Sequence, residues 1–231
     1  MEITIIHGQE HMGSTYHITN MVIKQLVDDN TKVNEYFMPK DTPAFCSGCF
    51  NCIQKGEYYC PEADRVQRIV QSMLHSQIIV IDSPTYCFEI SGQLKTLFDH
   101  LGYMWLSHRP RKEMFTKIGV AISTAAGAGA RRVTKSIVKQ MFWWGMPKTY
   151  QIHFIVNAAC WEDVSKKTKD KIIIKSKRIS RKVKRQIGKA KPNIISILIF
   201  NIMRKMQQSN TWNMVDRNYW QRNNWLKKER S

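Results

Sequence analysis

Four of the six cysteines fall within 15 residues, at a spacing that suits metal or redox chemistry. Cys46, Cys49 and Cys52 are each separated by two residues, and Cys60 follows directly before a proline. In a cytosolic protein, clustered cysteines favour metal binding or redox chemistry over structural disulfides. This spacing is close to the cysteine run of bacterial ferredoxins, so it predicts a [4Fe–4S] cluster held by these four thiols.

Two other interpretations of these cysteines stay open. The thiols could pack the loop or oxidise in pairs without a metal. Zinc is the third interpretation, although zinc more often takes two separated Cys-x-x-Cys pairs. The two cysteines outside the cluster, Cys87 and Cys160, are expected to act mainly as small packing residues. The seven histidines show no metal-ligand spacing.

A loop at the start of the chain, residues 7–15, could hold a phosphate. Gly8 and Gly13 permit close backbone approach, and Ser14 and Thr15 stand where a helix should begin. Free N–H groups and the helix dipole at such an N-terminus favour an anion. A simple N-cap by Ser14 or Thr15 is the alternative.

Two further loops have the composition to hold a flat ring. Residues 83–92 place Tyr86 and Phe88 beside small polar residues, which can cradle a conjugated ring. Residues 123–130 contain no side chain larger than threonine and leave space beside a ligand. They are not a dinucleotide-binding fingerprint, because Arg131-Arg132 follow where a further glycine is needed and no acidic residue stands about 20 residues later.

The elements that must position these loops alternate between strand and helix. Strands are predicted over residues 2–6, 32–38, 77–81, 118–122 and 150–156, and helices over 14–26, 63–75, 91–101, 131–144, 164–187 and 192–206. The run Ile-Ile-Val-Ile within residues 77–81 is typical of a strand buried on both faces. The alternation predicts an α/β fold with a doubly wound, five-stranded parallel sheet. Ligands of such sheets bind outside the carboxyl ends of the strands, where all three loops belong.

Charge divides the chain into two parts. The net charge is +18; residues 161–231 hold 20 Lys and Arg against 5 Asp and Glu, which leaves a net of only +3 for residues 1–160. We therefore predict a first domain over 1–160 and a basic helical extension over 161–231. Such asymmetry indicates contact with a polyanion, unless the charges simply lie on a solvated helix face. We expect the basic extension to contact an anionic membrane surface rather than nucleic acid.

The helix predicted over residues 192–206 carries an apolar stripe. The stripe consists of Ile194, Ile195, Leu198, Ile199, Ile202, Met203 and Met206. We expect it to pack on the core or on a second subunit; a membrane interface is the alternative. The apolar run is about half the roughly 20 residues that a membrane-spanning helix needs. The N-terminus does not resemble a signal peptide, which predicts a cytoplasmic protein.

Residues 1–160 resemble the family of NADPH-dependent FMN reductases and iron–sulfur flavoproteins. Three features carry the resemblance: the loop ending Gly13-Ser14-Thr15, the segment Ser83-Pro84-Thr85-Tyr86 followed by Gly92-Gln93-Leu94-Lys95 and Asp99, and the small-residue loop after the fourth strand. The resemblance implies a flavodoxin-like fold and non-covalently bound FMN. The iron–sulfur branch of the family has a compact cluster motif at the position of the cysteine segment.

The resemblance also implies which residues hold the FMN. The residues expected to bind the phosphate are Gln9, His11, Gly13, Ser14 and Thr15. Those expected to contact the isoalloxazine ring are Pro84, Thr85, Tyr86, Cys87 and Phe88. Those expected to line the other edge of the ring are Thr124, Ala125, Ala126, Gly127 and Gly129. Family members often have Arg or Lys in the phosphate loop, whereas this chain has Glu10 and His11. The phosphate would then rest on backbone N–H groups and hydroxyls.

The implied function is that of an FMN-dependent NAD(P)H oxidoreductase. Hydride from NAD(P)H would reach flavin N5, and the electrons would pass to an acceptor such as a quinone or nitro compound, or singly through the cluster. No catalytic side chain is required, and proteins of this family assemble as homodimers or homotetramers. The alternative from another class is a binding or tethering protein whose basic extension contacts an anionic membrane surface or nucleic acid.

Overall fold

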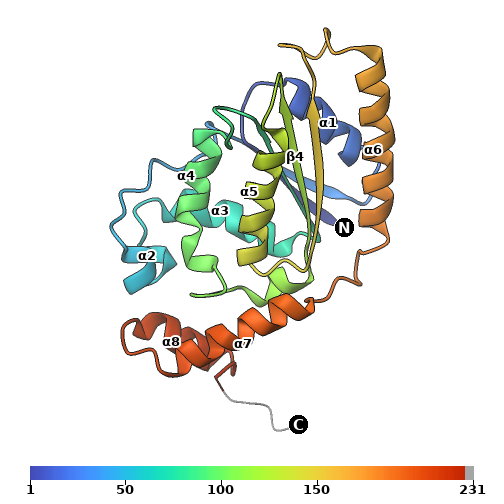
Figure 1. Cartoon of the computed structure of the whole chain (residues 1–231). Coiled ribbons are helices and arrows are strands. Elements are labelled where there is room, and N and C mark those ends of the chain that lie inside the picture. The colour runs from blue at the N-terminus through green and yellow to red at the C-terminus, as the bar shows by residue number, and fades with distance from the viewer. Residues whose placement is uncertain (227–231) are drawn as a thin grey trace.

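The predicted strands are present in the computed structural model, which describes residues 1–226. They are β1 (Glu2–His7), β2 (Lys32–Phe37), β3 (Ile78–Pro84), β4 (Ile118–Ala125) and β5 (Lys148–Ile155). All neighbouring pairs are parallel, and the strand order is β2-β1-β3-β4-β5 (Figure 1). This order confirms the predicted doubly wound, flavodoxin-like sheet.

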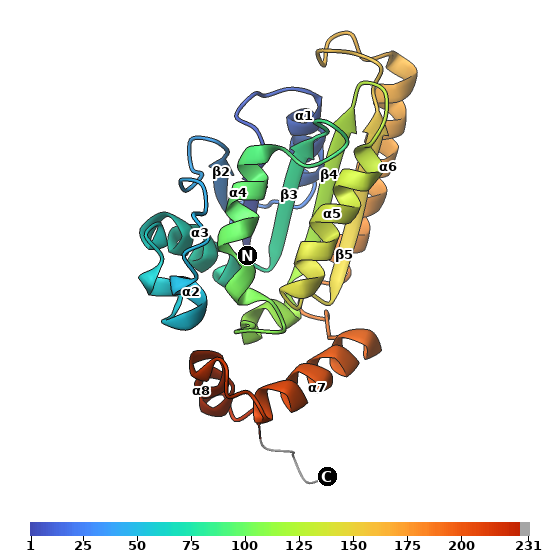
Figure 2. The same ribbon diagram turned by 60° about the vertical axis from the view of Figure 1, so that its left-hand side comes forward.

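Helices cover both faces of the sheet (Figure 2). One face carries α3 (Ala63–His75), α4 (Gly92–His100) and α5 (Ala130–Trp143), and the other carries α1 (Ser14–Ile23) and α6 (Lys166–Lys184). Shorter elements connect them: the one-turn helix α2 (Asn51–Gln54) and 3-10 turns at Glu57–Tyr59, Gly102–Met104 and Lys112–Thr116.

The central strand β3 explains why this sequence forms a two-sided sheet. Residues 78–81 are all fully buried, and they alternate between the two hydrophobic clusters. Ile79 and Ile81 pack under α3, α4 and α5, whereas Ile78 and Val80 face α1 and α6. Successive side chains of a strand point to opposite faces, so an unbroken apolar run must be covered twice.

The basic helix α6 belongs to the body of the fold. Its buried residues Ile172, Ile179 and Val183 join the cluster that also contains Ile18 and Val22 of α1. Its Lys and Arg side chains occupy the outer face. The division of the chain at residue 160 stays a prediction of sequence, because α6 completes the layer that α1 begins.

Two further helices, α7 (Ile194–Gln208) and α8 (Met214–Arg222), lie beyond the end of the sheet at which the strands begin (Figures 1 and 2). The expectation that the stripe of α7 packs on the core of this chain is wrong for most of its residues: Ile194 is 85% exposed and Leu198 59%, while Ile199 and Met203 are half-buried. The physical reason is that the inward face of α7 is instead occupied by Phe200, against Trp220, and by Gln207. Among the described residues, no helix is long and apolar enough to cross a membrane.

Candidate functional site

A cleft lies at the carboxyl ends of β1, β3 and β4, where the three candidate loops meet. Its space, including the part open to solvent, is about 780 Å³. The lining residues are Gln9, His11, Gly13, Ser14, Thr15, Tyr16, Asp82, Pro84, Thr85, Tyr86, Thr124, Ala125, Ala126, Val156, Ala158 and Ala159. Eleven of the fifteen residues predicted to hold FMN are among them, so the fold brings together the greater part of that set.

Four predicted residues, Cys87, Phe88, Gly127 and Gly129, lie outside the lining. Cys87 and Phe88 form the outer part of a tight turn in which Tyr86 and Glu89 exchange backbone hydrogen bonds of 3.0 and 2.9 Å. Both side chains are exposed. Gly129 has φ +98°, and a Cβ there would stand 2.8 Å from Thr85 Cγ2. It therefore lets the loop after β4 pack against the loop after β3.

Sequence reasoning missed a fourth wall of the cleft. Val156, Ala158 and Ala159 follow β5 and line the cleft together with Asp82 and Tyr16. Two signals could have found them. Ala158-Ala159 are small residues directly after a strand at the same edge of the sheet, and Asp82 is a charged residue at the end of an apolar run.

The N-terminus of α1 offers free hydrogen-bond donors to the cleft. Gly13 is its N-cap, no side chain caps it, and its first turn has no acidic residue. The first backbone bond into the helix is His17 N–H to Gly13 O, at 3.1 Å. The N–H groups of Ser14, Thr15 and Tyr16 precede that bond and are free of the helix ladder. Such a terminus suits an anionic ligand such as a phosphate.

Hydrogen bonds tie the cleft loops to one another. Thr15 Oγ1 and Thr124 Oγ1 are 2.6 Å apart and join the first loop to the third. Gln9 Nε2 donates to the Tyr86 hydroxyl at 3.3 Å. Thr85 and Ser123 share a hydroxyl contact of 3.1 Å. The three loops therefore form one connected rim.

A buried charge network stands beneath the cleft. His7 Nδ1 lies 2.6 Å from Asp82 Oδ2, and His7 Nε2 lies 2.8 Å from Glu35 Oε1. Thr19 donates to the same Asp82 oxygen at 2.7 Å. His7 is 1% exposed. Burial alone lowers the pKa of His7, but the charges and hydrogen bonds of Asp82 and Glu35 outweigh it and raise the pKa above its usual value.

We expect this network to make stability fall as pH rises above about 6.5. Because the folded-state pKa of His7 is raised, its contribution is fully present below the unfolded pKa and is lost as pH rises through the folded pKa. Urea unfolding of wild type and His7→Gln between acidic and mildly alkaline pH should show a flatter dependence in the variant. His75→Gln, an exposed histidine on α3, is the control. Equal pH dependence in wild type and His7→Gln would contradict the assignment.

The cysteine segment lies between β2 and α3, at the side of the fold that carries α2 (Figure 1). Cys46 and Cys49 are exposed, while Cys52 and Cys60 are half-buried. Burial raises the pKa of the Cys52 and Cys60 thiols, and charge on the neighbouring cysteines raises both further. The hydrogen bond from the Asn51 backbone N–H lowers the pKa of Cys49.

The chemistry of these donors suits an iron–sulfur cluster, since four thiols lie close enough to influence one another's charge. Within residues 1–226, however, no three His, Cys, Asp or Glu side chains converge into a metal-binding group. Cys60 Sγ stands instead 3.5 Å from His100 Nδ1. The four-cysteine ligand set therefore stays a prediction.

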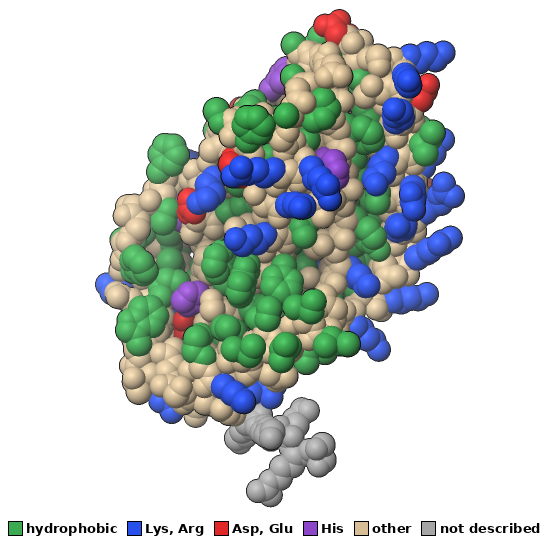
Figure 3. All heavy atoms as spheres, viewed as in Figure 1, with side chains coloured by type: hydrophobic (Ala, Val, Ile, Leu, Met, Phe, Trp, Pro, Cys, Tyr) green, Lys and Arg blue, Asp and Glu red, His purple; other side chains and the backbone are tan. Residues whose placement is uncertain are grey.

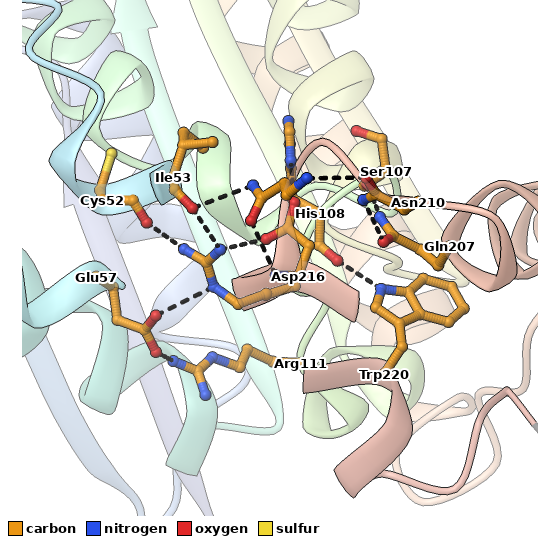
Figure 4. A network of polar contacts seen from close by, with 12 residues as sticks. Cys52, Ile53, Glu57, Ser107, His108, Arg111, Gln207, Asn210, Asp216 and Trp220 are labelled. Carbon is orange, nitrogen blue, oxygen red and sulfur yellow. Dashed lines mark hydrogen bonds and ion pairs between the residues drawn. The ribbon is translucent and has the colours of Figure 1, made fainter. Parts of the chain in front are cut away.

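Arg109 anchors the cysteine segment to α8, and Figure 4 labels its partners Cys52, Ile53, Glu57 and Asp216. Its guanidinium is buried and donates to the carboxylates of Glu57 and Asp216 and to the backbone carbonyls of Cys52 and Ile53. Asp216 belongs to α8 and also contacts His108 Nδ1 at 2.7 Å. Glu57 further pairs with Arg111. One buried cation thus joins three parts of the chain that are far apart in sequence.

Comparison with known proteins relates residues 1–159 to one family model, NADPH-dependent FMN reductase. An iron-sulfur flavoprotein of Archaeoglobus fulgidus is 23% identical over 154 residues, which span 66% of this chain and 67% of that protein. One of Clostridioides difficile is 28% identical over 145 residues, or 60% of this chain and 61% of the relative. A second iron-sulfur flavoprotein of Archaeoglobus fulgidus is 22% identical over 207 residues, which span 84% of this chain and 98% of that protein.

Solved structures show the same fold. An azoreductase of Bacillus anthracis superposes with a TM-score of 0.61 at 14% identity, covering 79% of this chain and 99% of that one. An NAD(P)H:quinone oxidoreductase of Methanothermobacter marburgensis gives a TM-score of 0.60 at 11% identity, covering 80% and 97%. At such identities the likeness concerns the fold alone.

Proposed function

Because this chain belongs to the NADPH-dependent FMN reductase family, we propose that it binds FMN in the cleft and works as an NAD(P)H-dependent oxidoreductase. The observation that carries the proposal is the uncapped N-terminus of α1, which opens into a cleft walled by small and hydroxyl-bearing residues. The FMN-containing structure of a Bacillus anthracis NADH-azoreductase, with a TM-score of 0.57 at 12% identity, has the same fold.

The residues of the cleft have separate tasks in this proposal. The N–H groups of Ser14, Thr15 and Tyr16 would hold the phosphate by charge-assisted hydrogen bonds. Thr124, Ala125 and Ala126 would leave room for the ring, and Tyr86 would cover its edge. Bound FMN supplies hydride acceptance from a nicotinamide and electron transfer in steps of one or two.

Asp82 adds a negative charge beside the cleft, balanced by His7. Its carboxylate is 2% exposed and is held by His7 and Thr19. A protonated His7 offsets part of this charge and so reduces the repulsion that Asp82 would exert on an anionic ligand. This positioning role needs no proton transfer to a substrate.

The cysteine segment supports a second part of the proposal, a [4Fe–4S] cluster on Cys46, Cys49, Cys52 and Cys60. The curated relatives carry the name iron-sulfur flavoprotein, and four thiols stand in one short segment here. Arg109 holds the backbone carbonyls of Cys52 and Ile53, so this part of the segment has a fixed path. A quinone or nitro compound as electron acceptor, and assembly as a homodimer or homotetramer, belong to the same proposal.

One anaerobic purification tests both parts. We expect the protein to carry one FMN per chain, to lose the flavin absorption bands on addition of NADH or NADPH, and to contain iron and sulfide. Cys52→Ser should lose the iron and retain FMN, whereas Cys160→Ser, outside the segment, should retain both. A chain that binds no FMN during reconstitution would overturn the oxidoreductase proposal. FMN without iron would overturn only the cluster.

A further inference from the structure

The outward face of α7 is a continuous apolar line. Ile194, Leu198, Ile202 and Met206 follow one another at intervals of four residues and are 85, 59, 51 and 44% exposed. Ile195, beside this line, is 62% exposed. Residues four apart lie above one another on a helix, so these side chains form one ridge. An apolar ridge of this length on a surface marks a contact site.

Packing on the inner side fixes the rotation of α7. The ring of Phe200 stacks on Trp220 with centroids 4.8 Å apart and meets the edge of Trp225 at 5.3 Å. Gln207, 1% exposed, donates to the Ser107 carbonyl at 2.8 Å. Rolling the helix to bury its aliphatic ridge would break both contacts. The ridge therefore faces outward as a consequence of the fold.

Unpaired positive charge lies at the N-terminal end of this ridge and beside it. Lys184, Arg185, Lys189 and Lys191, at the junction of α6 and α7, are all exposed, and Lys205 lies on the outward side of α7. Within residues 1–226, no Lys or Arg from position 166 onward forms an ion pair with Asp or Glu. Figure 3, in the view of Figure 1, shows hydrophobic side chains gathered over the lower part of the molecule, and Lys and Arg side chains along the edge that α6 forms.

We propose that α7 lies in the interface of an anionic lipid bilayer, with its ridge among the upper acyl carbons and the junction lysines on the lipid headgroups. An amphipathic helix with an apolar face and basic flanks binds in this way. At 15 residues α7 is too short to span a bilayer, so it lies along the surface. The site is at the opposite end of the sheet from the cleft and is independent of FMN.

Charge complementarity selects lipid over the other occupants of such a face. A second copy would bring another basic surface to this face without supplying an anionic partner for the unpaired lysines, and the like net charges repel. Nucleic acid would satisfy the lysines but leave the isoleucines and leucine in water. An anionic bilayer satisfies both parts of the surface.

The full chain should sediment with vesicles of phosphatidylcholine containing about 30% phosphatidylserine, and not with pure phosphatidylcholine. Raising salt from about 0.05 M to about 0.5 M should weaken the binding. Leu198→Gln/Ile202→Gln should bind at least about tenfold more weakly. Ile174→Gln/Val33→Gln replaces two exposed apolar residues outside α7 and should bind like wild type.

The contribution of charge is tested with two double variants that each remove two lysines. Lys189→Gln/Lys191→Gln should weaken binding about tenfold, whereas Lys40→Gln/Lys135→Gln, the same loss of charge at exposed sites on other elements, should change it less than about threefold. Circular dichroism confirms folding of each variant. Three results would overturn the proposal: no binding to the anionic vesicles, equal binding by the Leu198/Ile202 variant, or a dimer in solution that this variant dissociates. Duplex DNA that binds while the vesicles do not would do the same.

Discussion

Arg109→Leu is expected to lower the free energy of unfolding by about 3–5 kcal/mol. The guanidinium of Arg109 is buried against Asp216, which is itself 1% exposed, and against Glu57. Leucine fills part of the volume but leaves the Asp216 carboxylate with His108 as its remaining ionic partner. It also removes the donor to the carbonyls of Cys52 and Ile53. Removing one partner from a buried, hydrogen-bonded ion-pair network is among the few causes of losses of this size.

Urea unfolding measures the effect, and Arg68→Leu is the control. Arg68 also pairs with a carboxylate, that of Asp41, but its side chain is 59% exposed. An exposed pair contributes about 0–1 kcal/mol, so the control should stay close to wild type. Thiol-reactive reagents should also label Cys52 faster in Arg109→Leu. Similar losses in the two variants would show that the Arg109 network does not anchor the cysteine segment.

Ser14→Glu is expected to weaken FMN binding about 100-fold or more. The new carboxylate would stand at the N-terminus of α1, where its charge satisfies the free N–H groups and repels the phosphate. Like charges about 4 Å apart repel by roughly 4 kcal/mol near a protein surface, so 100-fold is a conservative figure. Fluorescence titration of the FMN-free protein measures the affinity.

Two variants separate this charge effect from other causes. Ser14→Ala removes the hydroxyl and keeps the backbone donors, and should cost tenfold at most, since one neutral hydrogen bond contributes about 1 kcal/mol. Asn20→Asp adds the same charge on α1 outside the cleft and should bind FMN as wild type does. If Ser14→Glu bound FMN normally, the phosphate would have to lie elsewhere.

The sequence alone determined the sheet and three walls of the cleft. Buried strands such as residues 78–81 can be recognised in the sequence because both of their faces must be apolar. The loops that follow such strands necessarily meet at one edge, so Ser14, Thr85 and Thr124 could be grouped without coordinates. The family model matches residues 1–159, the part of the chain that contains these loops.

Only the tertiary structure decided how the C-terminal third of the chain packs against the rest. Periodicity shows that α7 is amphipathic, but not which side finds a partner, because that depends on neighbours such as Trp220 and Ser107. The same holds for Arg109, whose partners come from positions 52–57 and 216. Contacts between distant segments produce no periodic pattern of residues in the sequence. Strands and helices do produce one, because their side-chain periods are set locally by the backbone.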